Sequence, residues 1–237
     1  MNGWSSVKKM KTHNIGCVIF DIDGTLVDSM GVWADADRQF LEKRGIAYLP
    51  SLSDKLRFLS FEKASEFIRD EYSLPMTVEE VSREITENVM YSYAHEIKPF
   101  KGVRECLERL REKGIRLCAA TANSPELAQT VLSANSLTEY LEFILTCEET
   151  GFGKDSRGFF AAVLDKLGLD ADRVCLADDS SHSLKTAHEM GIFTIGIAGE
   201  KNSEYGNVCL YSDAVAESAA DVYKVIFSLK YKEAVNE

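Results

Sequence analysis

The sequence has no excess of basic residues: 27 Lys and Arg stand against 38 Asp and Glu, which gives a formal net charge of −11. A chain of this charge repels polyphosphates, so sequence-independent binding of nucleic acid is a poor candidate function. No apolar run approaches the roughly 20 residues that a membrane-spanning helix needs, so we expect no membrane contact. The segment up to Asn14 has no apolar stretch either, which favours a cytoplasmic protein over a secreted one.

The sequence also lacks the cysteine and histidine spacings of common metal sites. Six cysteines are spread along the chain without a CxxC pair, and Cys17, Cys118 and Cys175 each lie inside a short apolar run. We therefore expect reduced cysteines that pack as small core residues in a reducing compartment. The four histidines are dispersed as well. Carboxylates would have to hold any metal ion, and such ligands favour a hard cation such as Mg²⁺.

Short apolar runs alternate with amphipathic helical patterns along most of the 237 residues. Helical patterns between the runs stop at Gly114 and Gly168, as helices ending in glycine do. Repeated strand, helix and strand predict an α/β protein with a Rossmann-like, mostly parallel sheet and helices on both faces. The runs predicted as buried strands are Ile15 to Phe20, Ile115 to Ala120, Phe143 to Thr146, Val174 to Ala177 and Ile192 to Ile197.

Residues 31–97 break this alternation and show helical patterns only, with a capping box predicted at Thr77 and Glu80. We interpret this stretch as a small helical domain inserted after the first strand, and residues 1–30 and 98–237 as the core. Such an insertion would lie over the carboxyl end of the first strand, where open α/β sheets bind ligands. Residues 201–237 should add a terminal strand and a helix around Val222 to Leu229.

The most informative segment is Asp21-Ile22-Asp23-Gly24-Thr25-Leu26-Val27-Asp28-Ser29, which directly follows the first predicted strand. Where the strand ends and the chain turns, both carboxylates of this segment can project into one crevice. By itself the pattern also fits an acidic turn or a helix cap. A calcium-binding loop is a further alternative, although the later acidic positions do not continue that pattern.

This segment, followed by a helical insertion, resembles the first motif of the haloacid dehalogenase superfamily in its helical-cap subgroup, which includes phosphoglycolate phosphatase and β-phosphoglucomutase. The family's second motif matches Thr121 at the end of a strand, and Ser124 and Pro125 after it can start a helix. The third and fourth motifs match Lys154 and the pair Asp178-Asp179. Two departures are visible: Asp155 and Arg157 stand where prolines are common, and Ser183 stands where many members carry another Asp.

The resemblance implies that Asp21 is a nucleophile towards a phosphoryl group. It implies a magnesium ion held by Asp21, Asp178, Asp179 and the backbone carbonyl of Asp23. The charge of Lys154, the hydroxyl of Thr121 and the backbone N–H groups of Gly24, Ala122 and Asn123 would then hold the phosphoryl oxygens. Taken singly, Lys154 also fits a solvated loop charge, Thr121 a strand-end cap and the Asp pair a turn.

Asp23 separates chemistries within this family, because a second carboxylate two residues on can act as general acid and then as general base. Dehalogenases lack it. We therefore expect a magnesium-dependent phosphatase for a small organic phosphomonoester, such as a sugar phosphate or a phosphoglycolate-like compound, acting through an aspartyl-phosphate. The alternatives are a phosphosugar mutase of the β-phosphoglucomutase type and a phosphometabolite-binding protein without catalysis.

The helical insertion should select the substrate, a small phosphorylated metabolite, by closing over the site and excluding water. Candidates to contact that substrate are Trp33, Arg38, Arg57, Phe58 and Lys63. Each has a structural alternative, since Trp33 also fits the interior of the inserted domain and the charged residues fit its solvated faces. We expect a monomer or a weak dimer.

Overall fold

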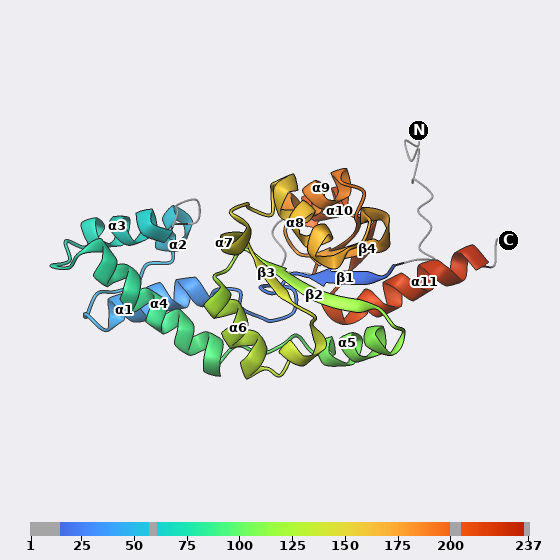
Figure 1. Cartoon of the computed structure of the whole chain (residues 1–237). Coiled ribbons are helices and arrows are strands. Elements are labelled where there is room, and N and C mark those ends of the chain that lie inside the picture. Colours follow the sequence, from blue (N-terminus) through green and yellow to red (C-terminus); the bar gives the residue numbers. More distant parts are fainter. Residues whose placement is uncertain (1–14, 57–60, 200–204, 235–237) are drawn as a thin grey trace, which may run out of the picture. The chain divides into compact units, whose positions relative to one another are not determined.

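The computed structural model describes residues 15–56, 61–199 and 205–234 (Figure 1). The chain forms two compact units. The core unit comprises Met1–Asp28 and Lys98–Glu237, and the helical unit comprises Ser29–Ile97. No helix among the described residues has both the length and the apolar character required to cross a membrane.

A six-stranded sheet in the order β3-β2-β1-β4-β5-β6 forms the centre of the core unit, and every neighbouring pair is parallel. The five predicted strands are confirmed with end shifts of one or two residues, and the predicted terminal strand is the short β6. The strands are β1 (Cys17–Phe20), β2 (Arg116–Thr121), β3 (Ile144–Thr146), β4 (Val174–Asp178), β5 (Phe193–Ile197) and β6 (Ala214–Ala216).

Helices cover both faces of this sheet, as the alternating pattern predicts. One face carries α8 (Arg157–Leu167), α9 (Ser181–Glu189) and α10 (Tyr205–Leu210), and the other carries α5 (Val103–Glu112), α6 (Pro125–Ala134) and α11 (Val222–Ala234) (Figure 1). Short elements connect them: α7 (Cys147–Thr150), η2 (Thr138–Tyr140), η3 (Ala171–Arg173) and η4 (Ala219–Asp221). Burial on both faces explains why β1 and β4 are apolar at nearly every position.

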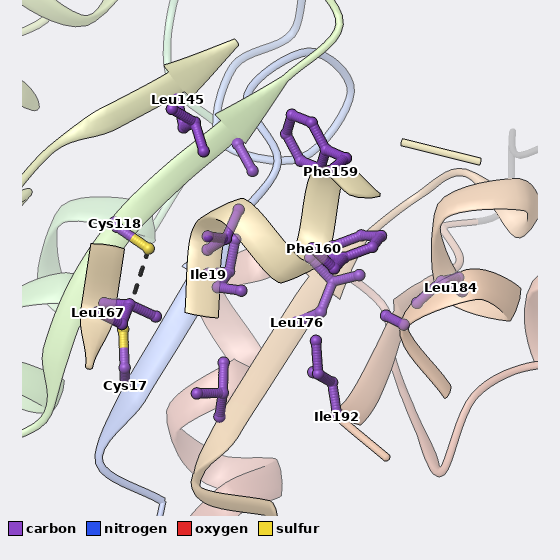
Figure 2. Close-up of a cluster of buried hydrophobic side chains, with 14 of the residues drawn as sticks. Cys17, Ile19, Cys118, Leu145, Phe159, Phe160, Leu167, Leu176, Leu184 and Ile192 are labelled. Carbon is purple, nitrogen blue, oxygen red and sulfur yellow. Dashed lines mark hydrogen bonds between the residues drawn. The ribbon is translucent and has the colours of Figure 1, made fainter. Parts of the chain in front are cut away.

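The buried cluster under α8 and α9 fixes these helices on the sheet (Figure 2). Phe159 and Phe160 of α8 are fully buried and their rings meet edge to face, with centroids 5.4 Å apart. Cys17 of β1 and Cys118 of β2 lie in the same cluster with their Sγ atoms 3.9 Å apart, and all six cysteines are free thiols. The predicted packing of Cys17, Cys118 and Cys175 as small core residues is confirmed, because all three are buried.

The helical unit contains α1 (Val32–Glu42), α2 (Ser51–Leu56), α3 (Phe61–Glu71) and α4 (Val78–His95). The capping box predicted at the start of α4 is present. The Glu80 N–H donates to Thr77 Oγ1 over 3.2 Å, and the Thr77 N–H donates to Glu80 Oε2 over 2.9 Å. Both α1 and α3 pack against α4.

Candidate active site

The residues matched to the four motifs cluster at one edge of the sheet in the core unit. Phe20 at the end of β1 is aligned with Ala119 of β2 and with Ala177 of β4. Asp21, Thr121 and Asp178 therefore lie at the carboxyl ends of three adjacent parallel strands. This edge is the place where open α/β sheets bind ligands.

The chain leaves β1 through a tight turn that separates the two carboxylates of the first motif. Asp21 still belongs to the sheet, because its N–H donates to the Ala177 carbonyl over 2.9 Å. Gly24 then adopts a left-handed conformation with φ 77°, which glycine reaches without steric cost. Its N–H donates to the Val27 carbonyl over 3.0 Å and closes the turn. Asp21 is 5% exposed, whereas Asp23 is only partly buried.

Lys154 reaches from the loop between α7 and α8 into the carboxylate cluster. Its Nζ lies 2.5 Å from Asp21 Oδ1, 2.7 Å from Asp178 Oδ2 and 3.4 Å from the Ala120 carbonyl oxygen. Its side chain is only 10% exposed. An ammonium group has three donors, and these three acceptors account for all of them. Lys154 is therefore an internal counter-ion rather than a solvated loop charge.

Asp178 is completely buried and accepts hydrogen bonds at both carboxylate oxygens. The Ser180 N–H donates to its Oδ1 over 2.8 Å, and the Ser183 hydroxyl donates to its Oδ2 over 2.7 Å. Together with Lys154, these donors compensate the cost of burying the carboxylate. Ser183, where the family pattern has an acid, thus supplies a neutral donor from the first turns of α9.

The electrostatics of the cluster show an excess of negative charge. Burial raises the pKa of Asp21 well above its usual value, and the neighbouring carboxylates add to this although Lys154 opposes it. Burial, followed by the charge of Asp178, raises the pKa of Asp179 to about 7. Burial by itself would lower the pKa of Lys154, but the charges of Asp178 and Asp21 outweigh it and the pKa is raised. Lys154 stays protonated, and one cation does not balance the carboxylates.

The donor set fits a divalent hard cation. One carboxylate oxygen from each of Asp21, Asp178 and Asp179 lies within 4.8 Å of the others. Octahedral Mg²⁺ with ligands at about 2.1 Å needs oxygens about 3 to 4 Å apart. The side chain of Asp23 is not in this group of described residues. A divalent ion would also supply the positive charge that the cluster lacks.

The groups predicted to hold phosphoryl oxygens lie near the same edge, at the ends of β1 and β2. Thr121 is 1% exposed, and its Oγ1 accepts the backbone N–H of Asn123 over 3.0 Å, which leaves the hydroxyl hydrogen as a donor. The N–H of Asn123 is thus bonded inside the loop, as the N–H of Gly24 is in its turn. A phosphate could take these two N–H groups only by replacing those bonds, whereas Ala122 is exposed.

The candidate substrate contacts of the helical unit are only partly described. Trp33 is 38% exposed, so it is not enclosed in the interior of this unit, which was the alternative to substrate contact. Arg38 pairs across the surface of α1 with Asp35 and Glu42, as a solvated helix face would. Lys63 is exposed on α3. The remaining two candidates, Arg57 and Phe58, lie outside the described residues.

Two contacts of the site were not anticipated from the sequence. The side-chain amide of Asn123 donates to Asp23 Oδ2 over 3.1 Å, and the Ser183 hydroxyl donates to Asp178. The contact of Ser183 could have been predicted from the sequence. A small polar residue at a position where many family members carry an acid indicates that a polar group lies next to it. No sequence signal pairs Asn123 with a residue 100 positions away.

Comparisons with known proteins agree with this architecture. A sequence model of haloacid dehalogenase-like hydrolases matches residues 18–197. The phosphorylated carbohydrates phosphatase of Thermotoga maritima is 26% identical over 200 residues, which cover 84% of this chain and 92% of that protein. The phosphoglycolate phosphatase of Agrobacterium fabrum is 27% identical over 186 residues, covering 76% and 78%.

Solved structures show the same fold at lower sequence identity. The Bacillus subtilis protein YfnB, bound to magnesium, superposes with a TM-score of 0.75 at 14% identity, over 90% of this chain and 99% of that one. The family model covers most of the chain, and the parallel sheet with its acidic edge is the architecture that the resemblance implies. The chain therefore belongs to the haloacid dehalogenase-like hydrolases, a family of enzymes.

Proposed function

We propose that the chain is a magnesium-dependent phosphatase that hydrolyses a small organic phosphomonoester through an aspartyl-phosphate. The observation that carries the proposal is the convergence of Asp21, Asp178, Asp179 and Lys154 at one edge of the sheet. Two relatives named as phosphatases of phosphorylated carbohydrates and of phosphoglycolate support the substrate class.

Asp21 is the nucleophile in this proposal. A carboxylate oxygen of Asp21 forms a bond to phosphorus while the bond from phosphorus to the ester oxygen breaks. Its position at the end of a buried strand, hydrogen-bonded through its own N–H, holds it rigidly for this attack. Lys154 offsets the repulsion between this carboxylate and an incoming phosphate dianion.

Asp23 handles the protons in both half-reactions. It donates a proton to the departing ester oxygen, so the alcohol leaves as a neutral molecule. It then removes a proton from water, which attacks phosphorus and breaks the bond to Asp21, so that inorganic phosphate is released. Asp23 is only partly buried, so water can reach its carboxyl group. Asp21 is 5% exposed and is much less accessible to water.

The site would hold magnesium through the carboxylates of Asp21, Asp178 and Asp179 and the backbone carbonyl of Asp23. When bound, the ion supplies positive charge against the phosphoryl oxygens and Asp21. The magnesium bound to the structural relative YfnB supports the choice of metal. We propose further that the helical unit, residues 31–97 in the sequence assignment, acts as the cap that selects the substrate.

Phosphate release from a panel of phosphorylated metabolites, with magnesium present or chelated, tests the proposal. We expect magnesium-dependent release of inorganic phosphate from at least one sugar phosphate or from phosphoglycolate. Asp21→Asn should abolish both turnover and the acid-trapped phosphoenzyme, whereas Asp23→Asn should slow hydrolysis and let the phosphoenzyme accumulate. Asp165→Asn, at an exposed carboxylate on α8, is the matched control and should retain full activity.

Three results would contradict the proposal. Full activity in both Asp21→Asn and Asp23→Asn would exclude the roles given to these carboxylates. Interconversion of hexose phosphate isomers without net release of phosphate would identify a mutase instead. Binding of phosphate without turnover of any ester, including p-nitrophenyl phosphate, would indicate a phosphometabolite-binding protein.

A further inference from the structure

The loop after β2 contacts the proposed acid–base residue directly. Asn123 Nδ2 donates to Asp23 Oδ2 over 3.1 Å, although the two residues are 100 positions apart in sequence. The contact is possible because β1 and β2 are adjacent and parallel, so their carboxyl-terminal loops meet. Both side chains are partly buried, which lowers competition from water.

Asn123 is held at three of its atoms. Its backbone N–H donates to Thr121 Oγ1 over 3.0 Å, and its side-chain Oδ1 accepts the Ser124 N–H over 3.3 Å. Exchanging the amide oxygen and nitrogen would bring two donors together at Ser124, so the Nδ2 group is the one that faces Asp23. The Ser124 hydroxyl in turn accepts the Leu127 N–H and starts α6. The loop therefore presents an amide donor in a fixed direction.

We propose that Asn123 is a positioning residue that orients the Asp23 carboxyl group for proton transfer. This inference rests on the proposed function, because it requires Asp23 to act as acid and base. The amide N–H bonds Oδ2 and so fixes the direction in which the Asp23 carboxyl group faces the leaving ester oxygen and, later, the attacking water. A general acid contributes only when it is aimed within hydrogen-bond reach, and small misplacements are costly.

Substrates that differ in leaving group distinguish positioning from general damage to the site. A p-nitrophenolate ion departs without a proton, whereas the alcohol of phosphoglycolate needs one. For Asn123→Ala we expect kcat/KM to fall about 10- to 100-fold towards phosphoglycolate and less than about threefold towards p-nitrophenyl phosphate. A structural role alone lowers both values by the same factor, and that result would overturn the proposal.

A double-mutant cycle with Asp23→Ala tests whether Asn123 acts through Asp23. We expect Asn123→Ala to have no further effect on phosphoglycolate turnover once the Asp23 carboxyl group is gone. If the two substitutions lower phosphoglycolate turnover by independent factors that multiply in the double variant, the positioning role is refuted and the proposed function stays intact. An Asp23→Ala variant with unchanged phosphoglycolate turnover would instead refute the acid role of Asp23, and with it the proposed function.

Two further variants distinguish a loss of positioning from a folding defect. Asn123→Asp keeps the shape of the side chain and the acceptor for the Ser124 N–H, but it removes the donor to Asp23 and adds a negative charge beside it. It should lower phosphoglycolate turnover at least as much as Asn123→Ala does, and normal turnover of phosphoglycolate would overturn the proposal. Asn135→Ala is the control, because the buried Asn135 side chain donates to the Val131 carbonyl at the end of α6. It should affect both substrates equally.

Discussion

Asp37 is a buried carboxyl group in α1 of the helical unit. It is 9% exposed, and among the described residues it has no hydrogen bond or ion pair. Burial raises its pKa to about 7. Asp37→Asn replaces this group by an amide of nearly the same shape that does not titrate. We expect the variant to be more stable than the natural protein at neutral and alkaline pH.

The magnitude follows from the difference between the folded and unfolded states. An aspartate in an unfolded chain has a pKa of about 3.9, so the folded value lies about 3 pH units higher. Between about pH 4 and about pH 7 the folded state binds more protons than the unfolded state, so the free energy of unfolding falls as pH rises. At about 1.4 kcal/mol for each unit, the full cost of ionising Asp37 is about 4 kcal/mol. Below about pH 4 the group contributes nothing.

Urea unfolding of the metal-free protein, followed by circular dichroism at several pH values, measures this effect. The unfolding free energy of Asp37→Asn minus that of the natural protein should rise by up to about 4 kcal/mol from about pH 4 to about pH 8. Taking this difference cancels the titration of the active-site carboxylates. A difference that stays constant with pH would refute the assignment of a buried, uncompensated carboxyl group.

Asp35→Asn is the matched control on the same helix. Asp35 is exposed and pairs with Arg38 at the surface. Exposed ion pairs contribute little to stability. The unfolding free energy of Asp35→Asn minus that of the natural protein should therefore change by less than about 1 kcal/mol over the same pH range. If this difference rises with pH in Asp35→Asn as much as in Asp37→Asn, the gain in stability comes from removing a negative charge from α1 and not from the burial of Asp37.

Two further predictions concern single buried hydroxyl groups. Ser65 in α3 is fully buried, and within the part of the chain that the structure describes its Oγ has no hydrogen-bond partner. Ser65→Ala should therefore raise the free energy of unfolding by about 1 kcal/mol in urea titrations, and a loss of stability would mean that the hydroxyl is bonded. Ser183→Ala removes a hydrogen-bond donor to Asp178. At the proposed magnesium site, the magnesium concentration for half-maximal activity should therefore rise about 10-fold or more. An unchanged concentration would show that this hydrogen bond does not orient Asp178 for metal binding.

The fold was largely predictable because its signals are local. Strands buried on both faces must be apolar along their whole length, so β1 and β4 could be found from composition alone. Their ends were visible as well, since each run stops at an aspartate. Parallel strands joined by helices leave few possible topologies. The convergence of Asp21, Thr121 and Asp178 at one edge followed from that topology, not from the spacing of these residues.

Contacts that depend on side-chain direction could not be predicted in the same way. The bond from Asn123 to Asp23 needs the exact rotamer of a loop residue, and polar loop residues are common without such roles. Trp33 extends the apolar side of α1 but ends 38% exposed, since periodicity does not show how far the packing of a helix continues. Asp37 had one overlooked signal, because Trp33 and Leu41 lie four residues to either side on the same face.

The charge of the site explains why a serine at position 183 is compatible with the rest of the cluster. Asp21, Asp178 and Asp179 oppose the single charge of Lys154, so two negative charges remain when all three acids are ionised. If Asp23 carries the proton that its proposed role requires, one divalent ion balances this excess. An aspartate in place of Ser183 would add a further buried negative charge beside Asp178, at a considerable cost in desolvation. The serine instead donates a hydrogen bond to Asp178 without changing that balance.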